Sequence, residues 1–181
     1  MTHWIEAIEK TTRNFQDSFG ELHADQLNWK PAADKWSIAQ NMDHLIVINS
    51  SYFPIIESLK KGTYKAPFLG KVGFVVSFFG KMILNSVNPD RRQKMSTFPI
   101  WEPTKSEIPV GILDRFVAHQ AELKKMIEDS QDLLEKGAVI SSPANTNIVY
   151  KLEKAFDIIV THEQRHLEQS KEVYHLMKAE G

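Results

Sequence analysis

Apolar residues recur every three or four positions in four long stretches of the sequence, a pattern that predicts four amphipathic helices. The first helix is expected to start at Thr2 as its N-cap, and the second to follow Ser37 as its N-cap, with a kink or a frayed end at Pro54. The inner positions of the first helix are Ile5, Ile8, Thr12, Phe15, Phe19 and Leu22. Those of the second are Ile38, Asn41, Leu45, Ile48, Tyr52, Ile55 and Leu59.

The third and fourth stretches complete the pattern. The third helix is expected to open at Ser106, with Pro109 near its first turn, and to end at a C-cap at Gly137. Its inner positions are Ile112, Phe116, His119, Leu123, Met126 and Leu133. The last helix is expected from about Asn147 to Lys178, with Ile148, Leu152, Ala155, Ile159, His162, His166, Gln169, Val173 and Leu176 as its inner positions. Four helices with one inner stripe each predict an all-α fold, a four-helix bundle in a single domain over residues 1–181.

The sequence between the second and third helices is first apolar and then rich in proline. Within residues 67–87 we expect one extra apolar helix, roughly Phe68 to Asn85, followed by an extended connector laid across the bundle. The connector carries Pro89, Pro99 and Pro103 around Trp101. Lys71 and Lys81 leave only nine uncharged residues between them, whereas a bilayer-spanning helix needs about 20. The extra helix is therefore expected to be interfacial or buried.

Composition and charge narrow the classes of function. The chain has 22 basic and 23 acidic residues, so it lacks the positive excess that a nucleic-acid backbone or an anionic membrane would attract. We expect neither nucleic acid nor membrane as a partner. The N-terminus shows no basic stretch followed by an apolar run and a cleavage site, so we expect a cytoplasmic protein. Because the chain has no cysteine, a metal site must use imidazole, carboxylate, amide or water ligands.

His162, His166 and Gln169 occupy three successive inner positions of the last helix, where the other inner residues are aliphatic. An unpaired buried imidazole or amide costs on the order of 1–3 kcal/mol, so these side chains need something to bind. Histidines at positions i and i+4 lie one turn apart on the same helical face and can converge on one ion. The pair therefore indicates a metal site.

His44, on the second helix, is the candidate third ligand. On a helical geometry of about 100° per residue it falls at the edge of the inward arc, while Asp43 and Glu57 are expected to project outward. Taken alone, His44 could instead be a core histidine bonded to a backbone carbonyl. Together with the pair on the last helix, it predicts a site for one divalent transition metal held by three imidazoles.

Two segments resemble the signatures of one family, the DinB-like (YfiT-like) helical-bundle proteins. The segment LNWKPAADKWSIAQNMDHL, residues 27–45, resembles the early signature of the family, and HEQRHLEQ, residues 162–169, resembles its closing metal motif. The resemblance spans nearly the whole chain in order and spacing. It implies a four-helix bundle with a divalent metal, often zinc or nickel, held by one histidine of the second helix and two of the fourth. These positions fall on His44, His162 and His166.

The same resemblance implies an activity class. Some members resemble thiol-dependent transferases or isomerases, many are described as metal-dependent hydrolases, and others have no known activity. Three neutral imidazoles leave at least one coordination position open, which is typical of a catalytic site. We expect a metal-dependent hydrolase or thiol S-transferase acting on an unidentified small molecule, with a low-molecular-weight thiol as a candidate cosubstrate. The catalytic residues are unknown, and Asn41 and Gln169 are candidates either for orienting the ligands or for bridging helices.

Several alternatives stay open. The segment from His162 to His166 also matches H-E-x-x-H, the zinc-peptidase motif with glutamate as general base. Only 15 residues follow His166, without a familiar downstream ligand or a strand-rich half, so we expect no peptidase and place Glu163 in solvent or at the rim. His119 is expected to be structural. Three tryptophans are interpreted as pocket lining or as packing plugs, namely Trp29, Trp36 and Trp101.

A non-enzymatic function is the main rival hypothesis. In it, the metal fastens the helices while the apolar segment of residues 67–87 mediates dimerisation or binds a partner. A homodimer is compatible with either function.

Overall fold

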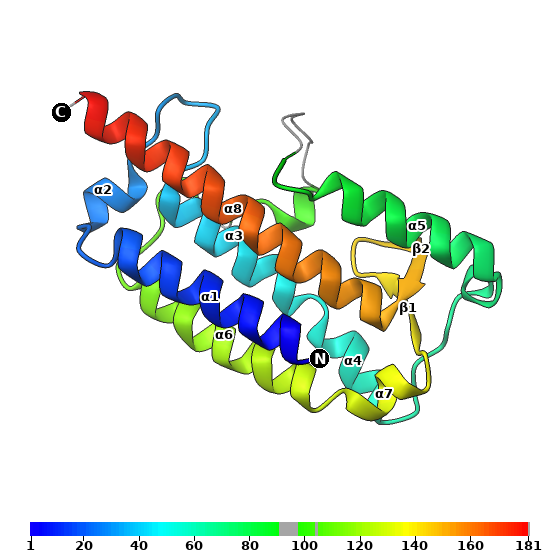
Figure 1. Cartoon of the computed structure of the whole chain (residues 1–181). Helices are drawn as coiled ribbons and strands as arrows, with labels where there is room; N and C mark the ends of the chain where they lie inside the picture. The colour runs from blue at the N-terminus through cyan, green and yellow to red at the C-terminus, as the bar shows by residue number, and fades with distance from the viewer. Residues whose placement is uncertain (91–97, 104, 181) are drawn as a thin grey trace.

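The computed structural model describes residues 1–90, 98–103 and 105–180, and within them the chain is mostly helical with a small two-stranded hairpin (Figure 1). The α-helices are α1 (Thr2–Phe19), α2 (Ala24–Asn28), α3 (Ile38–Ser50), α4 (Phe53–Lys60), α5 (Gly73–Ser86), α6 (Ile112–Glu128), α7 (Gln131–Glu135) and α8 (Leu152–Glu180). The 3₁₀-helices are η1 (Phe68–Lys71) and η2 (Pro99–Trp101), and the strands are β1 (Val139–Ser142) and β2 (Asn145–Lys151).

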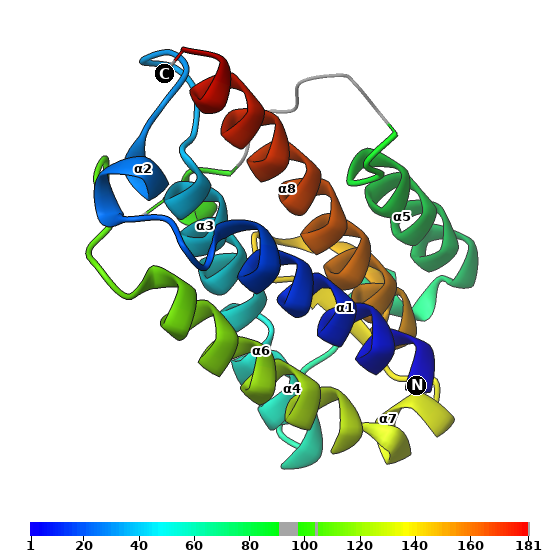
Figure 2. The ribbon, with the colours of Figure 1, turned by 60° about the vertical axis from the view of Figure 1, so that its left-hand side comes forward.

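The helices α1, α3, α6 and α8 lie side by side along the length of the molecule (Figures 1 and 2). Helix α8 packs against both α1 and α3, and α6 packs against the same two helices. Each of these four helices therefore has two neighbours among the other three, and the apolar stripes predicted from the sequence face one another. The interior that results holds the predicted histidines of α3 and α8.

Local sequence explains where α3 and α4 begin. The Ser37 hydroxyl accepts a hydrogen bond from the backbone N–H of Gln40, and the Gln40 side chain accepts one from the Ser37 N–H, which is a complete capping box. The predicted N-cap at Ser37 is confirmed. Helix α3 ends at Ser50, and α4 starts with Pro54 in its first turn, where a missing N–H is harmless. The predicted interruption near Pro54 is confirmed as well.

The predictions for the first and third helices are wrong at three points. Thr2 lies inside α1, whose N-cap is Met1. Helix α6 begins at Ile112 rather than Ser106, because Gly111 has a φ of 83° and stops any helix from extending back through Pro109. The third stretch is also two helices, since the chain breaks after Glu128 and resumes as α7.

Gly137 closes α7 as predicted. Its φ is 63°, and hydrogen bonds run from its N–H to the Leu134 carbonyl and from the Ala138 N–H to the Leu133 carbonyl. These two bonds are the Schellman pattern, which satisfies the last carbonyls of a helix and requires a left-handed residue. The prediction that the helical stretch ends at Gly137 is thus confirmed, although the C-cap residue itself is Lys136 and Gly137 is the left-handed residue that follows it.

The hairpin β1–β2 is the largest departure from the predicted helices. The last helix was expected to begin near Asn147, but residues 145–151 pair as an antiparallel strand with residues 139–142, and α8 begins at Leu152. The β-branched and aromatic residues Ile148, Val149 and Tyr150 favour a strand, and the spacing of Ile148 to Leu152 imitated a helical turn. Val149 and Tyr150 are buried in the core that this hairpin closes.

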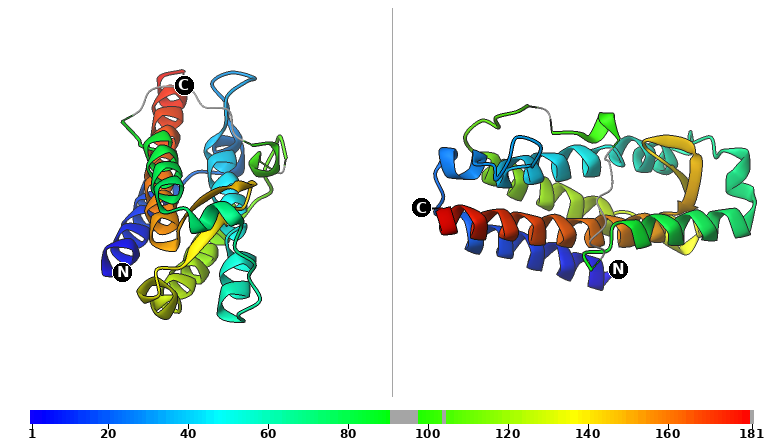
Figure 3. Two further views of the ribbon diagram at one scale, coloured as in Figure 1. Left: turned by 90° about the vertical axis from the view of Figure 1, so that its right-hand side faces the viewer. Right: turned by 90° about the horizontal axis from the view of Figure 1, so that it is seen from above.

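The apolar segment forms η1 and α5, close to the predicted helix from Phe68 to Asn85. Helix α5 packs against β2 and α8 on the outside of the molecule, as the two views of Figure 3 show. Gly80 permits this approach, since a Cβ there would lie 2.9 Å from Cγ of Lys154 and 3.4 Å from Cβ of Tyr150. Of the connector, only part lies in the described residues, and it includes the 3₁₀ turn η2 rather than extended chain alone. In the described part of the chain, no helix is long and apolar enough to cross a membrane.

The interior consists of two apolar clusters with polar side chains between them. One cluster, around Ile8, Tyr52, Leu123 and Ile159, lies toward the hairpin. The other surrounds Phe15, Leu45, Phe116 and Leu167. On each long helix a buried polar residue separates the two clusters, and we call these four residues the polar layer: Thr11, Asn49, Gln120 and Glu163. The three predicted histidine ligands occur beside this layer on α3 and α8.

Candidate metal centre

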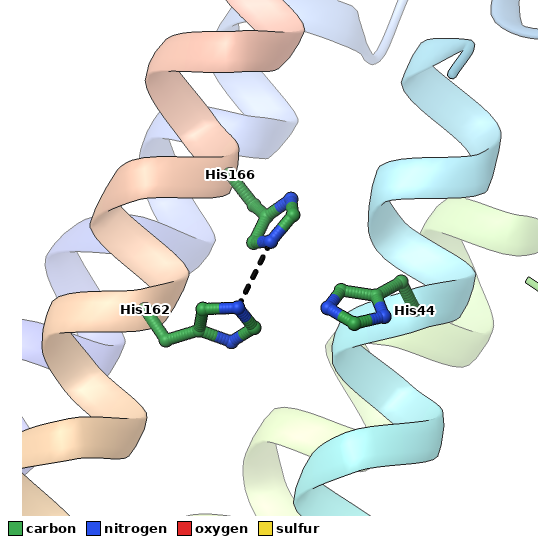
Figure 4. A group of neighbouring side chains, drawn as sticks. All are labelled: His44, His162 and His166. Atoms are coloured by element: carbon green, nitrogen blue, oxygen red, sulfur yellow. Dashed lines mark hydrogen bonds between the residues drawn. The ribbon is translucent and has the colours of Figure 1, made fainter. Parts of the chain in front are cut away.

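The structure brings the three predicted histidines together (Figure 4). His44 projects from α3, and His162 and His166 project from successive turns of α8, so that the rings face a common point. One ligand nitrogen from each ring lies within 4.8 Å of the others, and the Nε2 atoms of His162 and His166 are 3.0 Å apart. This cluster, which we call the histidine cluster, could hold a metal ion.

The outer nitrogens of two rings are anchored by the protein. His44 Nδ1 donates to the Trp101 carbonyl at 2.5 Å, and His166 Nδ1 donates to Asn41 Oδ1 at 2.6 Å. Each anchor fixes the proton on Nδ1 and leaves the lone pair of Nε2 directed inward, the arrangement that metal-binding histidines usually show. In the described residues, the buried Nε2 of His44 has no hydrogen-bond partner. A metal ion would give this nitrogen the partner that it lacks.

Burial keeps the histidine cluster neutral. His44 is 0% exposed and His166 is 6% exposed, while His162 is partly buried. Desolvation is the largest cause that lowers the pKa of each of the three rings. The neighbouring imidazoles and Arg165 lower the pKa of His162 and His166 further, whereas the Trp101 carbonyl partly offsets the shift at His44. Neutral imidazole is the form that binds metal, so the electrostatics favour a ligand over a protonated ring.

Two tryptophans border the histidine cluster. The Trp36 ring lies 4.8 Å from the His44 ring and stacks on the His166 ring at 5.9 Å between centroids. Trp101 is buried and supplies the carbonyl that holds His44. Trp29 instead packs at the edge of the apolar cluster around Phe15. The prediction had named all three tryptophans without separating their roles, and only contacts between distant segments distinguish them.

The predicted neighbours of the ligands have mixed outcomes. Asn41 holds His166 and also donates to the Ser37 carbonyl at 2.9 Å, so it both orients a ring and ties down the start of α3. Gln169 is partly buried one turn beyond His166. Asp43 was expected to point outward, but it is 3% exposed and forms an ion pair with Arg115 at 3.3 Å. The α3–α6 contact buries this side of α3.

Contrary to the prediction, Glu163 lies neither in solvent nor at the rim of the site. It is 0% exposed, and its Oε1 accepts hydrogen bonds from Asn49 at 2.8 Å and Gln120 at 2.7 Å. Burial raises the pKa of Glu163 to about 7, although both amides lower it. A carboxylate enclosed in this way cannot reach substrate, which argues against the zinc-peptidase function. The predicted position of Glu163 is wrong because α8 buries a wider part of its circumference than the single stripe of residues assumed from the sequence.

His119 is structural in its contacts, as predicted. It is 5% exposed on α6, and its ring stacks on Phe53 with 5.6 Å between centroids. Burial lowers its pKa to about 4. His119 is not part of the histidine cluster.

These features define a class: a mostly helical protein with a buried three-histidine cluster, two of whose rings lie one turn apart on the last helix. The sequence model of the DinB superfamily matches residues 7–170, and the chain belongs to this superfamily. The family predicted from the two signatures is therefore confirmed. Neither a curated protein nor a solved structure matches the chain.

Proposed function

We propose that His44, His162 and His166 bind one divalent transition metal, zinc or nickel, and that the protein is a metal-dependent enzyme. The observation that carries the metal proposal is the direction of the ring nitrogens. The Nδ1 atoms of His44 and His166 are occupied by the protein, and the Nε2 atoms meet in a desolvated space. Three neutral nitrogens without cysteine suit both ions.

The catalytic proposal rests on the number of protein ligands. Three imidazoles leave a coordination position for water or substrate, which structural sites do not. A metal held there would lower the pKa of a bound water or thiol, or polarise an electrophile. The chain's own contribution is to hold the rings, to cover His44 and His166 with the indole of Trp36, and to keep His162 partly exposed on the side from which a substrate would approach. We infer a small-molecule substrate and either hydrolysis or thiol S-transfer, the latter with a low-molecular-weight thiol as cosubstrate.

The fold proposal is the predicted four-helix bundle. The packing of α8 and α6 against α1 and α3 supports it, with α5 as the extra apolar helix outside the bundle. This arrangement explains why two ligands come from one helix and the third from a neighbour across the interior.

Metal binding is tested on protein purified without a histidine tag. Elemental analysis and calorimetric titration with Zn²⁺ and Ni²⁺ are expected to give one ion per chain for the wild type. His44→Ala removes one ligand and should abolish stoichiometric binding, whereas His119→Ala, an equally buried histidine outside the cluster, should retain it. Equal metal affinity in wild type and His44→Ala would overturn the proposal.

Catalysis is tested separately on the metal-loaded protein. Thiol cofactors with small electrophiles, and small esters and amides, are supplied to the wild type and to His44→Ala. Turnover that disappears with His44 and with chelation supports an enzyme. If the metal only raises the unfolding temperature and no substrate turns over, the alternative of a metal-stabilised module for dimerisation or partner binding gains support.

A further inference from the structure

The outer side of α5 exposes apolar residues that a folded protein usually covers. Phe68, Phe74 and Phe78 are 77%, 79% and 60% exposed, and Met82 is 40% exposed. We call these four residues the α5 patch. Phe68 belongs to η1, which packs against α5, and the other three residues belong to α5 itself. Single exposed apolar residues are common on protein surfaces, but several gathered on two adjoining elements mark a contact surface.

The geometry of α5 makes the patch continuous. Phe74, Phe78 and Met82 are spaced by four residues and thus lie along one side of the helix. Val76 and Gly80 are buried on the other side, against the strand β2 and the helix α8. Helix α5 is therefore apolar on two faces, and among the described residues only one of these faces packs against the rest of the chain. Figure 2 shows α5 at the edge of the molecule with α8 on one side of it.

The charge around the α5 patch differs from that of the whole chain. Between Ser58 and Pro89 the sequence has five of the 22 basic residues and none of the 23 acidic ones. Lys65, Lys71 and Lys81 are exposed, and Lys81 lies on the helix between Phe78 and Met82 in sequence. The prediction that no membrane is a partner used the overall charge of −1, in which acidic residues elsewhere in the chain cancel the charge of this basic segment. The two elements that bear the patch, η1 and α5, carry Lys71 and Lys81 and no acidic residue, so they have a positive excess that the chain as a whole lacks.

We infer that the α5 patch docks on the surface of an anionic lipid bilayer. The phenylalanines would enter the boundary between headgroups and acyl chains, and the lysines would contact the acidic headgroups, as in helices that lie in a membrane interface. The docking is peripheral, because no helix in the described residues could span a bilayer. This inference is independent of the metal proposal.

Charge and shape favour a bilayer over the other occupants. In a symmetric contact between two copies, the lysines that border the patch would face lysines, which is unfavourable. An acidic partner protein would have to present a surface that is complementary in shape to α5 as well as in charge. Two hollows of the described surface lie away from α5, one at Trp29 and Met177 and one between Phe19 and Asp114. A bilayer requires no matching shape, only apolar side chains beside basic ones.

The test is flotation of the full chain with two kinds of vesicle, phosphatidylcholine alone and phosphatidylcholine with phosphatidylglycerol. The wild type should bind the anionic vesicles, and binding should weaken as salt is raised. Phe74→Ser with Phe78→Ser should weaken binding roughly tenfold or more, since two aromatic side chains that would become buried in the bilayer are lost. Lys71→Glu with Lys81→Glu should weaken it by about fivefold per lysine or more. All four positions are exposed, so the variants are expected to fold like the wild type.

Two control variants match these changes elsewhere on the surface. Val110→Ser removes an apolar side chain that is 85% exposed, and Lys10→Glu reverses an exposed charge on α1. Both should bind vesicles like the wild type. Absence of wild-type binding, equal binding to neutral vesicles, or equal loss in the control variants overturns the proposal. A dimer detected by light scattering and dissociated by the phenylalanine variant, without vesicle binding, would assign the patch to a second copy instead.

Discussion

Replacement of His119 by phenylalanine should make the protein less sensitive to acid. His119 is buried against Phe53, and burial lowers its pKa from 6.5 to about 4. The folded state therefore holds the ring neutral, while the unfolded chain binds a proton below pH 6.5. Because the unfolded state binds more protons, stability is complete above pH 6.5 and falls as the pH is lowered toward 4. Phenylalanine keeps the ring stack and removes the titration.

The magnitude follows from the two pKa values. Between pH 7.5 and pH 5.0, a group that shifts from 6.5 to about 4 on folding removes about 2 kcal/mol of unfolding free energy. The wild type should therefore lose about 2 kcal/mol more than His119→Phe over this interval. Urea unfolding at both values of pH, with chelator present so that the histidine cluster contributes equally, measures the difference. His175→Gln, at an exposed position, serves as control and should follow the wild type. Parallel loss of stability in the wild type and His119→Phe would refute the reasoning.

Three further changes test the anchors of the fold and the site. Asn41→Ala removes the hydrogen-bond acceptor for His166 Nδ1, so the metal affinity measured by calorimetry should fall by about 10- to 100-fold. One ion per chain should still bind at saturation. An unchanged affinity would show that Asn41 only bridges helices. Ser37→Ala removes the side-chain half of the capping box of α3 and should cost about 1 kcal/mol in chemical unfolding, with Ser51→Ala as a comparison at the other end of the helix. Gly137→Ala forces a Cβ into a left-handed conformation and should cost about 1 kcal/mol, whereas no loss would mean that the turn after α7 readjusts.

The features that depend on a few neighbouring residues could be predicted from the sequence alone. The N-cap at Ser37 and the closing glycine at Gly137 have short-range causes, and the sequence predicts both at the right residues. The pair His162 and His166 follows from helical spacing alone. These features require only that the helices form, not that their rotations be known.

Features that depend on tertiary packing were not predictable in the same way. The sequence pattern predicts helix where β2 forms, because Ile148 and Leu152 fit a helical period and the strand that pairs with β2 precedes the turn at residues 143–144. Asp43 and Glu163 were placed outside, since one apolar stripe per helix was assumed. In fact α3 and α8 each pack against two other long helices, so polar residues beside the stripe are buried as well. Their partners, Arg115 on α6 and the amides of the polar layer, could be identified only in three dimensions.

His44 is oriented by a main-chain oxygen of the segment that follows α5, not by another side chain. A point substitution of Trp101 would remove an indole but keep the acceptor, because every amino acid carries that carbonyl. A lengthened or shortened η2 would move the acceptor while leaving each ligand residue in the sequence intact. The length of this segment therefore helps to set the orientation of His44, and a search for sequence motifs would not detect a change in it.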